Sequence, residues 1–217
     1  MIDFALARRM MVDSQLRPSD VTDQEVLAAF LGVARERFVP ADLASVAYLD
    51  RDLAVDGKRA LLKPMVLARM MQAAEIKAGN RVLDVACGTG YSSAIMARLG
   101  ALVTALDDDT ARSRRCGEIL AQVGAGSVSA VSGPLDAGWT AGAPYDVILV
   151  NGACETEPQG LFRQLDDGGR LMVVMGTGPI GKATLFRKDR GEIGSRPVFD
   201  AAAPALPAFA KAPAFVF

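Results

Sequence analysis

The stretch from Val82 to Tyr91, VLDVACGTGY, constrains the fold of this chain more than any other. Its first half is apolar apart from Asp84, which is typical of a strand buried on both faces of a parallel sheet. Gly88 and Gly90 then allow a tight turn and a close approach of the backbone to a ligand. A helix-compatible run follows and ends at Gly100, a C-terminal stop signal. The stretch therefore predicts a strand, turn and helix that hold a nucleotide-like ligand at the end of a parallel sheet.

The turn departs from the dinucleotide-binding fingerprint G-x-G-x-x-G, because Ser93 stands at the third glycine position. A second apolar run follows the helix and ends at Asp107. This residue comes about 20 residues after Asp84, the spacing at which an acidic residue grips a ribose diol from the end of the next strand. For Asp108 and Asp109, capping of the following helix is the alternative.

These residues resemble the first motif of class I S-adenosylmethionine (AdoMet) methyltransferases, an acidic residue followed by G-x-G-x-G. Ala86 stands at the first glycine position, and Gly88 and Gly90 match the other two. The resemblance implies an α/β fold, a Rossmann-like class I methyltransferase sheet with helices on both faces, and AdoMet as cofactor. The cofactor contacts that it implies are Asp84, Ala86, Cys87, Gly88, Thr89, Gly90, Tyr91, Asp107, Asp108, Gly133, Pro134, Leu135 and Asn151. For Asn151, a turn-capping role is an equal alternative.

Composition narrows the possible functions. A chain of 217 residues that is 51% hydrophobic can bury a sizeable core, and fits one main domain with an N-terminal extension. Its net charge of −1 gives no electrostatic reason to expect nucleic acid or an anionic membrane as a partner. The chain has no histidine, which excludes Ser-His-Asp and Cys-His nucleophiles and histidine metal ligands, so we expect no metal site.

The cysteines and the N-terminal sequence indicate the cellular compartment in which we expect the protein. Cys87, Cys116 and Cys154 are widely spaced and form no C-x-x-C pair, so neither a disulfide framework nor a zinc site is expected. No apolar run is long enough to span a bilayer, and the N-terminus lacks the apolar region of a signal peptide. We therefore expect a reducing, cytoplasmic setting.

Residues 1–76 are expected to form an N-terminal helical extension with the substrate-side loop, packed on the main domain. Helical spacing of apolar residues predicts a first helix over residues 3–16, which Pro18 would end. The segment from Thr22 to Glu25 is a capping-box pattern that opens a second helix. A third is predicted from Pro64 to about Glu75, since proline favours the first helical position.

The resemblance becomes more specific outside the glycine turn. Residues 33–40 (VARERFVP) and 47–50 (AYLD) are similar to the V-P-R-E-x-F-V-P and A-Y-x-D segments of protein-L-isoaspartate O-methyltransferases. Residues 11–16 match the opening of that family, and residues 143–150 match its A-P-F-D-x-I-x-V segment. The similarity covers roughly residues 10 to 190. It implies an AdoMet-dependent O-methyltransferase with a small-molecule methyl donor and a protein or peptide acceptor.

Two positions depart from that family. Aligned on Pro64, Leu62 stands where the family has a serine that, with the neighbouring backbone, cradles the isoaspartyl carboxylate. Leucine donates no hydrogen bond, so a carboxylate held there would lose about 1.5–3 kcal/mol. Lys63 is a candidate replacement, with a solvated lysine as the alternative. Pro134 replaces an aspartate that positions the adenine; Asp136 is a candidate substitute, although a turn residue is the simpler explanation.

The remainder alternates between helices and strands, which places an AdoMet-binding Rossmann-like domain over residues 77–200. Residues 182–188 and 193–199 are predicted to pair as a hairpin. The Ala/Pro-rich segment 201–217 would wrap over the sheet or dock on a partner through Phe209, Phe215 and Phe217. The other predicted elements are a helix at 110–123, strands at 127–131 and 143–150, a helix at 157–165 and a strand at 170–175.

Three functions are compatible with these observations. The first is an AdoMet-dependent methyltransferase resembling protein-L-isoaspartate O-methyltransferase. The second is a degenerate AdoMet-binding or non-catalytic protein that keeps the fold without methyl transfer, which Leu62 and Pro134 motivate. The third is methyl transfer to another acceptor. We favour the methyltransferase class and leave the acceptor, the oligomeric state and the catalytic residues open.

Overall fold

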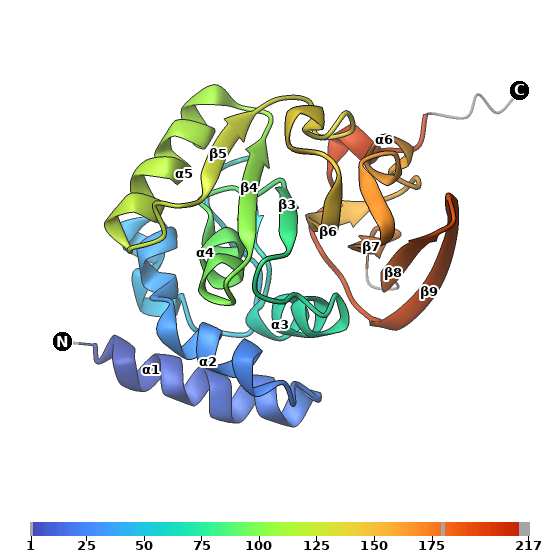
Figure 1. Ribbon diagram of the computed structural model, residues 1–217. Helices are drawn as coiled ribbons and strands as arrows, with labels where there is room; N and C mark the ends of the chain where they lie inside the picture. The colour runs from blue at the N-terminus through green and yellow to red at the C-terminus, as the bar shows by residue number, and fades with distance from the viewer. Residues whose placement is uncertain (1, 179–180, 213–217) are drawn as a thin grey trace, which may run out of the picture.

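The computed structural model describes residues 2–178 and 181–212. Within these ranges a seven-stranded sheet has the order β5-β4-β3-β6-β7-β8-β9 (Figure 1). The strands from β5 to β7 pair in parallel, and β8 and β9 are antiparallel to their neighbours. The strands are β3 (Arg81–Val85), β4 (Leu102–Asp107), β5 (Ser129–Ser132), β6 (Tyr145–Cys154), β7 (Leu165–Met175), β8 (Lys182–Asp189) and β9 (Glu192–Asp200).

Helices precede and alternate with the strands. A separate two-stranded hairpin, β1 and β2, lies between α2 and α3 in the sequence. The helices are α1 (Phe4–Met11), α2 (Gln24–Gly32), α3 (Pro64–Ala73), α4 (Tyr91–Arg98), α5 (Thr110–Gln122) and α6 (Gln159–Phe162), and the hairpin strands are β1 (Leu53–Ala54) and β2 (Ala60–Leu61). Short 3-10 turns span Arg35–Phe38, Ala41–Val46, Thr140–Gly142 and Pro207–Phe209.

The core consists of two apolar layers, one on each face of the sheet. On one face, Val82 and Val147 pack with residues of α2 to α5. On the other, Leu83 and Ile148 pack with α6 and with Phe209 from the C-terminal segment. Because side chains alternate along a strand, the nearly continuous apolar run of β3 supplies both layers. The predicted α/β architecture is confirmed.

The N-terminal helices differ locally from the prediction. The first ends as an α-helix at Met11, continues as a π-helical turn at Val12–Leu16, and passes into a 3-10 turn at Arg17–Ser19. Pro18 is accommodated at the start of this 3-10 turn, because the backbone amides of a first helical turn have no hydrogen-bond partner within the helix. Asp23, rather than Thr22, caps α2, with its carboxylate accepting hydrogen bonds from two amides of the first turn.

The predicted helix at residues 157–165 is shortened to α6, the four residues Gln159–Phe162. The strand predicted at residues 143–150 extends to Cys154, because Ala153 and Cys154 pair with the end of β7. The hairpin of β8 and β9 is confirmed.

The C-terminal segment lies against the sheet through Ala205, which bridges to Ala153. Phe209 is buried there and its carbonyl accepts hydrogen bonds from the amides of Glu155 and Thr156. Phe209 therefore packs within this chain, while Phe215 and Phe217 lie outside the described residues. No helix among the described residues has the length and apolar character needed to cross a membrane.

Candidate cofactor site

The glycine turn connects β3 to α4, and residues Ala86–Gly90 are all buried. Ala86, Gly88 and Gly90 have φ angles of 58°, 58° and 90°. Ala86 thus keeps the left-handed conformation at the first glycine position of the motif, at a cost of about 1 kcal/mol. At Gly90 a Cβ atom would lie 2.7 Å from the Cys116 sulfur. Close packing on α5 therefore makes glycine necessary at this position.

Asp84 is held at the end of β3 by three side chains. Its carboxylate accepts hydrogen bonds from Ser92 Oγ at 2.7 Å, from Ser93 Oγ, and from Asn151 Nδ2 at 2.6 Å. Burial raises the pKa of Asp84 to about 6, and these hydrogen bonds oppose the shift. Ser93, which breaks the dinucleotide fingerprint, and Asn151, a predicted cofactor contact, both hold Asp84 in place.

Asp84 should make stability depend on pH. Its pKa of about 6 in the folded state exceeds the ordinary value of 3.8, so between these values the folded chain binds more protons than the unfolded chain. The unfolding free energy therefore falls as pH rises through this window. We expect the stability of the wild type relative to Asp84→Asn to fall by about 2 kcal/mol from about pH 4 to about pH 7. Urea unfolding of both proteins measures this; a pH-independent difference would contradict it.

Asp107 lies at the end of β4, and its carboxylate reaches the glycine turn. Oδ2 accepts hydrogen bonds from the Gly88 amide and from Arg59 Nε, each at 3.0 Å. Oδ1 accepts the Asp108 amide at 2.8 Å and a guanidinium nitrogen of Arg112. The side chain is fully buried. Burial raises the pKa of Asp107, and the two guanidinium groups oppose that shift.

The two following aspartates have different roles. Asp109 caps α5 by accepting a hydrogen bond from the Arg112 amide at 2.8 Å, which is the capping alternative. The Asp108 carboxylate instead lies 2.7 Å from a nitrogen of Arg59 and 3.1 Å from one of Arg112. Both arginines therefore join Asp107 and Asp108 into one charged cluster.

Several predicted contacts have side chains that serve the core. Thr89 Oγ1 donates to the Phe38 carbonyl at 2.7 Å, and the Cys87 thiol lies 4.0 Å from that of Cys116. The Tyr91 ring packs edge-on against Phe38 at 5.5 Å. Any contact from these three residues to a cofactor would have to come from the backbone.

Gly133, Pro134 and Leu135 follow β5 beside Asp107. The Gly133 amide donates to the Asp107 carbonyl at 3.0 Å, and Leu135 is buried in the core. Gly133 and Pro134 line a cavity of about 250 Å³ together with Trp139.

On the substrate side, Leu62 is buried in the core and its carbonyl accepts a hydrogen bond from Arg35 at 2.8 Å. Lys63 precedes α3, and its amide donates to Asp52 Oδ1 at 2.8 Å. The next free amide, of Met65, donates to Asp50 Oδ1 at 3.1 Å. The chain's own carboxylates therefore occupy the amides beside the family serine position.

Arg59, Arg112 and Arg35 are the important residues that the sequence analysis missed. Arg112 had a local signal, because it lies four residues after Asp108, a spacing at which helical side chains pair. Arg59 had none, since β1 and β2 have two residues each and no usable periodicity. Arg35 is fully buried, and its guanidinium lies 4.7 Å from the centre of the Tyr91 ring.

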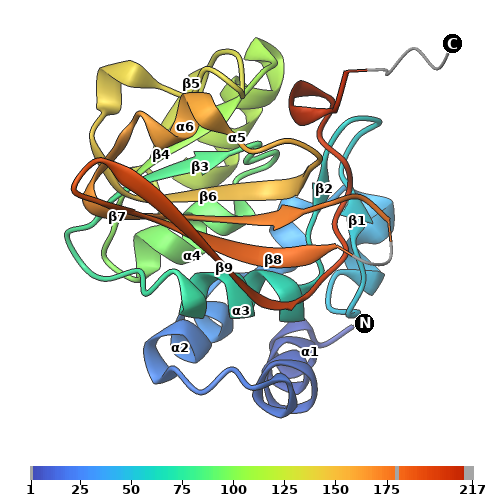
Figure 2. The same ribbon diagram turned by 90° about the vertical axis from the view of Figure 1, so that its right-hand side faces the viewer.

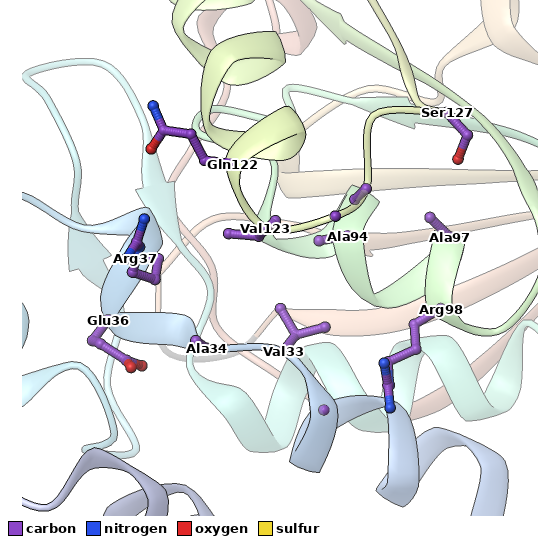
Figure 3. A pocket seen from close by; sticks show the side chains of 13 residues that line it. Val33, Ala34, Glu36, Arg37, Ala94, Ala97, Arg98, Gln122, Val123 and Ser127 are labelled. Carbon is purple, nitrogen blue, oxygen red and sulfur yellow. The ribbon is translucent and has the colours of Figure 1, made fainter.

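A separate cavity of about 430 Å³ lies between the Arg35–Phe38 turn and the C-terminal ends of α4 and α5 (Figure 3). Val33 and Val123 are among its lining residues, and Arg37 and Arg98 stand at different sides of it. None of its lining residues belongs to the predicted cofactor set.

Comparison with known proteins decides the family. The model of the family "Protein-L-isoaspartate(D-aspartate) O-methyltransferase (PCMT)" matches residues 7–201. The chain belongs to this family. Among similar relatives, the protein-L-isoaspartate O-methyltransferase of Gloeobacter violaceus is 41% identical over 167 residues, covering 77% of this chain and 82% of that protein. That of Methylorubrum populi is 38% identical over 184 residues, covering 85% of each.

Solved structures of the PCMT class have the same fold. A protein-L-isoaspartate O-methyltransferase with 26% identity has a TM-score of 0.80 and covers 93% of this chain and 67% of its own. A Plasmodium falciparum protein assigned to the same class, in complex with S-adenosyl-L-homocysteine, also has a TM-score of 0.80; it is 17% identical and covers 93% and 98%. The sheet is thus a class I methyltransferase sheet.

Membership of the PCMT family makes this chain an AdoMet-dependent O-methyltransferase by homology, with AdoMet as its cofactor. The site has the chemical groups that bind a nucleoside in proteins of this fold. A carboxylate at the end of β4 adjoins a glycine turn. Their arrangement does not leave that carboxylate free, because Arg59 and Arg112 cover Asp107.

Proposed function

We propose that this PCMT-family chain transfers the methyl group of AdoMet to a carboxylate oxygen of a peptide or protein. The contact between Asp107 and the Gly88 amide carries the proposal, because it joins the ribose-binding acid to the glycine turn. Bound AdoMet supplies an electrophilic methyl group. The chain's own contribution is to position the reactants. A carboxylate acceptor is already ionised at neutral pH, so the absence of histidine is no obstacle.

The predicted cofactor contacts remain part of this proposal. Asp107 would hold the ribose, and the backbone from Ala86 to Gly90 would approach the nucleoside. Gly133 and Pro134 would border the adenine, since the Gly133 amide contacts the Asp107 carbonyl and both residues line a cavity. Residues 77–200 would form the cofactor-binding unit, with residues 1–76 on the acceptor side.

The isoaspartyl carboxylate of a protein is the first acceptor to test, as the family implies. Its recognition here would differ from the family pattern, because Leu62 supplies no hydroxyl and is buried. Asp50 and Asp52 already accept hydrogen bonds from the nearby amides. Lys63 is the residue that we propose to attract an acceptor carboxylate in their place.

A second candidate function is AdoMet binding without methyl transfer. The observations that favour it are the occupied amides at Lys63 and Met65 and the arginine on Asp107. The hydrogen bonds to these two amides and the contact of Arg59 with Asp107 would have to break before an acceptor carboxylate and a nucleoside could bind side by side.

A methyl-transfer assay by mass spectrometry separates the two functions. The substrate is an isoaspartyl peptide, and the matched control is the same peptide with a normal aspartyl linkage. We expect methylation of the isoaspartyl peptide alone, with a weaker apparent affinity for it in Lys63→Met. Binding of AdoMet without transfer to any peptide or protein carboxylate would instead support the second function.

The three cysteines in the described residues are free thiols. Free thiols persist in reducing compartments. They therefore support the proposal that this protein works in the cytoplasm.

A further inference from the structure

The carboxylate of Asp107 has no acceptor position left for a ribose. A carboxylate offers about four lone-pair positions. Two amides, those of Gly88 and Asp108, fill two of them, and Arg59 and Arg112 fill the others. A ribose diol needs hydrogen bonds to this same carboxylate, so at least one present partner must leave before a nucleoside binds.

Of the four partners, Arg59 is the one that comes from outside the main sheet and its helices. The two amides belong to the backbone beside Asp107 itself. Arg112 projects from α5 and also pairs with Asp108 and with Asp56, at 2.7 Å. Arg59 belongs to the β1–β2 hairpin, a two-stranded sheet separate from the main one, with an exposed tip at Asp56–Lys58 (Figure 2).

The two terminal nitrogens of Arg59 have partners other than Asp107. One donates to the neighbouring Lys58 carbonyl at 3.0 Å. The other pairs with Asp108 Oδ1 at 2.7 Å. Arg59 thus contacts both Asp107 and Asp108, and its contact with Asp107 is the one that a ribose would replace.

The hairpin also covers the glycine turn. A Cβ atom on Gly88 would meet the Arg59 Cβ at 3.6 Å and a Val55 methyl group at 3.8 Å. The hairpin therefore lies over Gly88 and would have to move if a nucleoside approached the backbone from this side.

We propose that Arg59 closes the cofactor site, standing on Asp107 in place of the ribose, and that a nucleoside binds only when the β1–β2 hairpin withdraws. The inference rests on the proposed function, since it takes Asp107 as the ribose-binding group. In this scheme Arg59 competes with the cofactor. Removing Arg59 therefore strengthens binding instead of weakening it.

Calorimetric titration with S-adenosylhomocysteine tests the competition. We expect Arg59→Ala to bind at least about tenfold more tightly than the wild type. Asp107 remains satisfied in this variant by two amides and Arg112. Lys58→Ala is the matched control, because it removes one positive charge from the exposed residue that directly precedes Arg59 in the same hairpin. We expect its affinity to equal that of the wild type.

A second variant, Asp56→Ala, tests the same inference while leaving Asp107 and Arg59 unchanged. Asp56 accepts the amides of Lys58 and Arg59 and pairs with Arg112, so it ties the hairpin tip to α5. We expect about threefold tighter binding. Hydrogen–deuterium exchange provides a readout independent of affinity: residues 53–61 of the wild type should exchange faster when S-adenosylhomocysteine is bound.

The outcomes separate this inference from the proposed function. Equal or weaker binding by Arg59→Ala, or slower exchange of residues 53–61 on binding, would overturn the inference. Weaker binding would in addition make Arg59 a ligand contact. If neither the wild type nor Arg59→Ala binds S-adenosylhomocysteine, the proposed function fails, and the role of Arg59 fails with it.

Discussion

Gly90→Ala is expected to lower the free energy of unfolding by about 2–5 kcal/mol. The residue has a φ of 90°, and a Cβ atom would lie 2.7 Å from the Cys116 sulfur and 3.1 Å from Leu120. The left-handed conformation costs alanine about 1–2 kcal/mol, and overpacking adds about 1–3 kcal/mol. Urea unfolding followed by circular dichroism measures the loss.

Gly88→Ala is the matched control within the same turn. Its φ is 58°, and its Cβ would make only ordinary contacts, 3.6 Å or longer. We expect a loss of about 1 kcal/mol, from the backbone conformation alone. Equal losses for the two variants would show that the packing of Gly90 on α5 has been misjudged.

Arg35→Ala is expected to destabilise the chain by about 4 kcal/mol. The buried guanidinium donates to the carbonyls of Ala47 and Leu62, each at 2.8 Å, and stacks over Tyr91. Its removal leaves two buried carbonyls without donors, at about 1–3 kcal/mol each, and opens a cavity. Burial also lowers the pKa of Arg35, so losing this desolvated charge offsets part of the cost.

Arg37→Ala is the control for Arg35, because Arg37 is exposed in the same 3-10 turn. A surface substitution of this kind changes stability by less than about 0.5 kcal/mol. Thermal unfolding of both variants gives the comparison. A small effect at Arg35 would mean that water or neighbouring groups satisfy the two carbonyls, and that Arg35 does not fix the segment around Leu62.

The parts of the fold and site that could be predicted from the sequence have local causes. The apolar runs of β3 and β4 define buried parallel strands, and the glycines between β3 and α4 define the turn. Because parallel strands end at one edge of the sheet, Asp107 could be expected beside that turn. The contact between Asp107 and Gly88 agrees with this expectation.

The remaining features depend on contacts between distant parts of the chain. Arg59 meets Asp107 across 48 residues, from a hairpin too short to leave a pattern in the sequence. Asn151 reaches Asp84 across 67 residues, so its role as a partner of that carboxylate could not be read from its own surroundings. Leu62 was identified as a departure from the family serine, but only the packing shows that its side chain lies in the core.

Calorimetric titration of Asp107→Asn with S-adenosylhomocysteine, beside the wild type, tests whether Asp107 binds the ribose. We expect saturable binding at one site in the wild type, and binding about a hundredfold weaker in the variant, because a ribose diol would lose two charge-assisted hydrogen bonds. Circular dichroism must first show that the variant is folded. Equal affinity of the two proteins would contradict the assignment of Asp107 as the ribose-binding group.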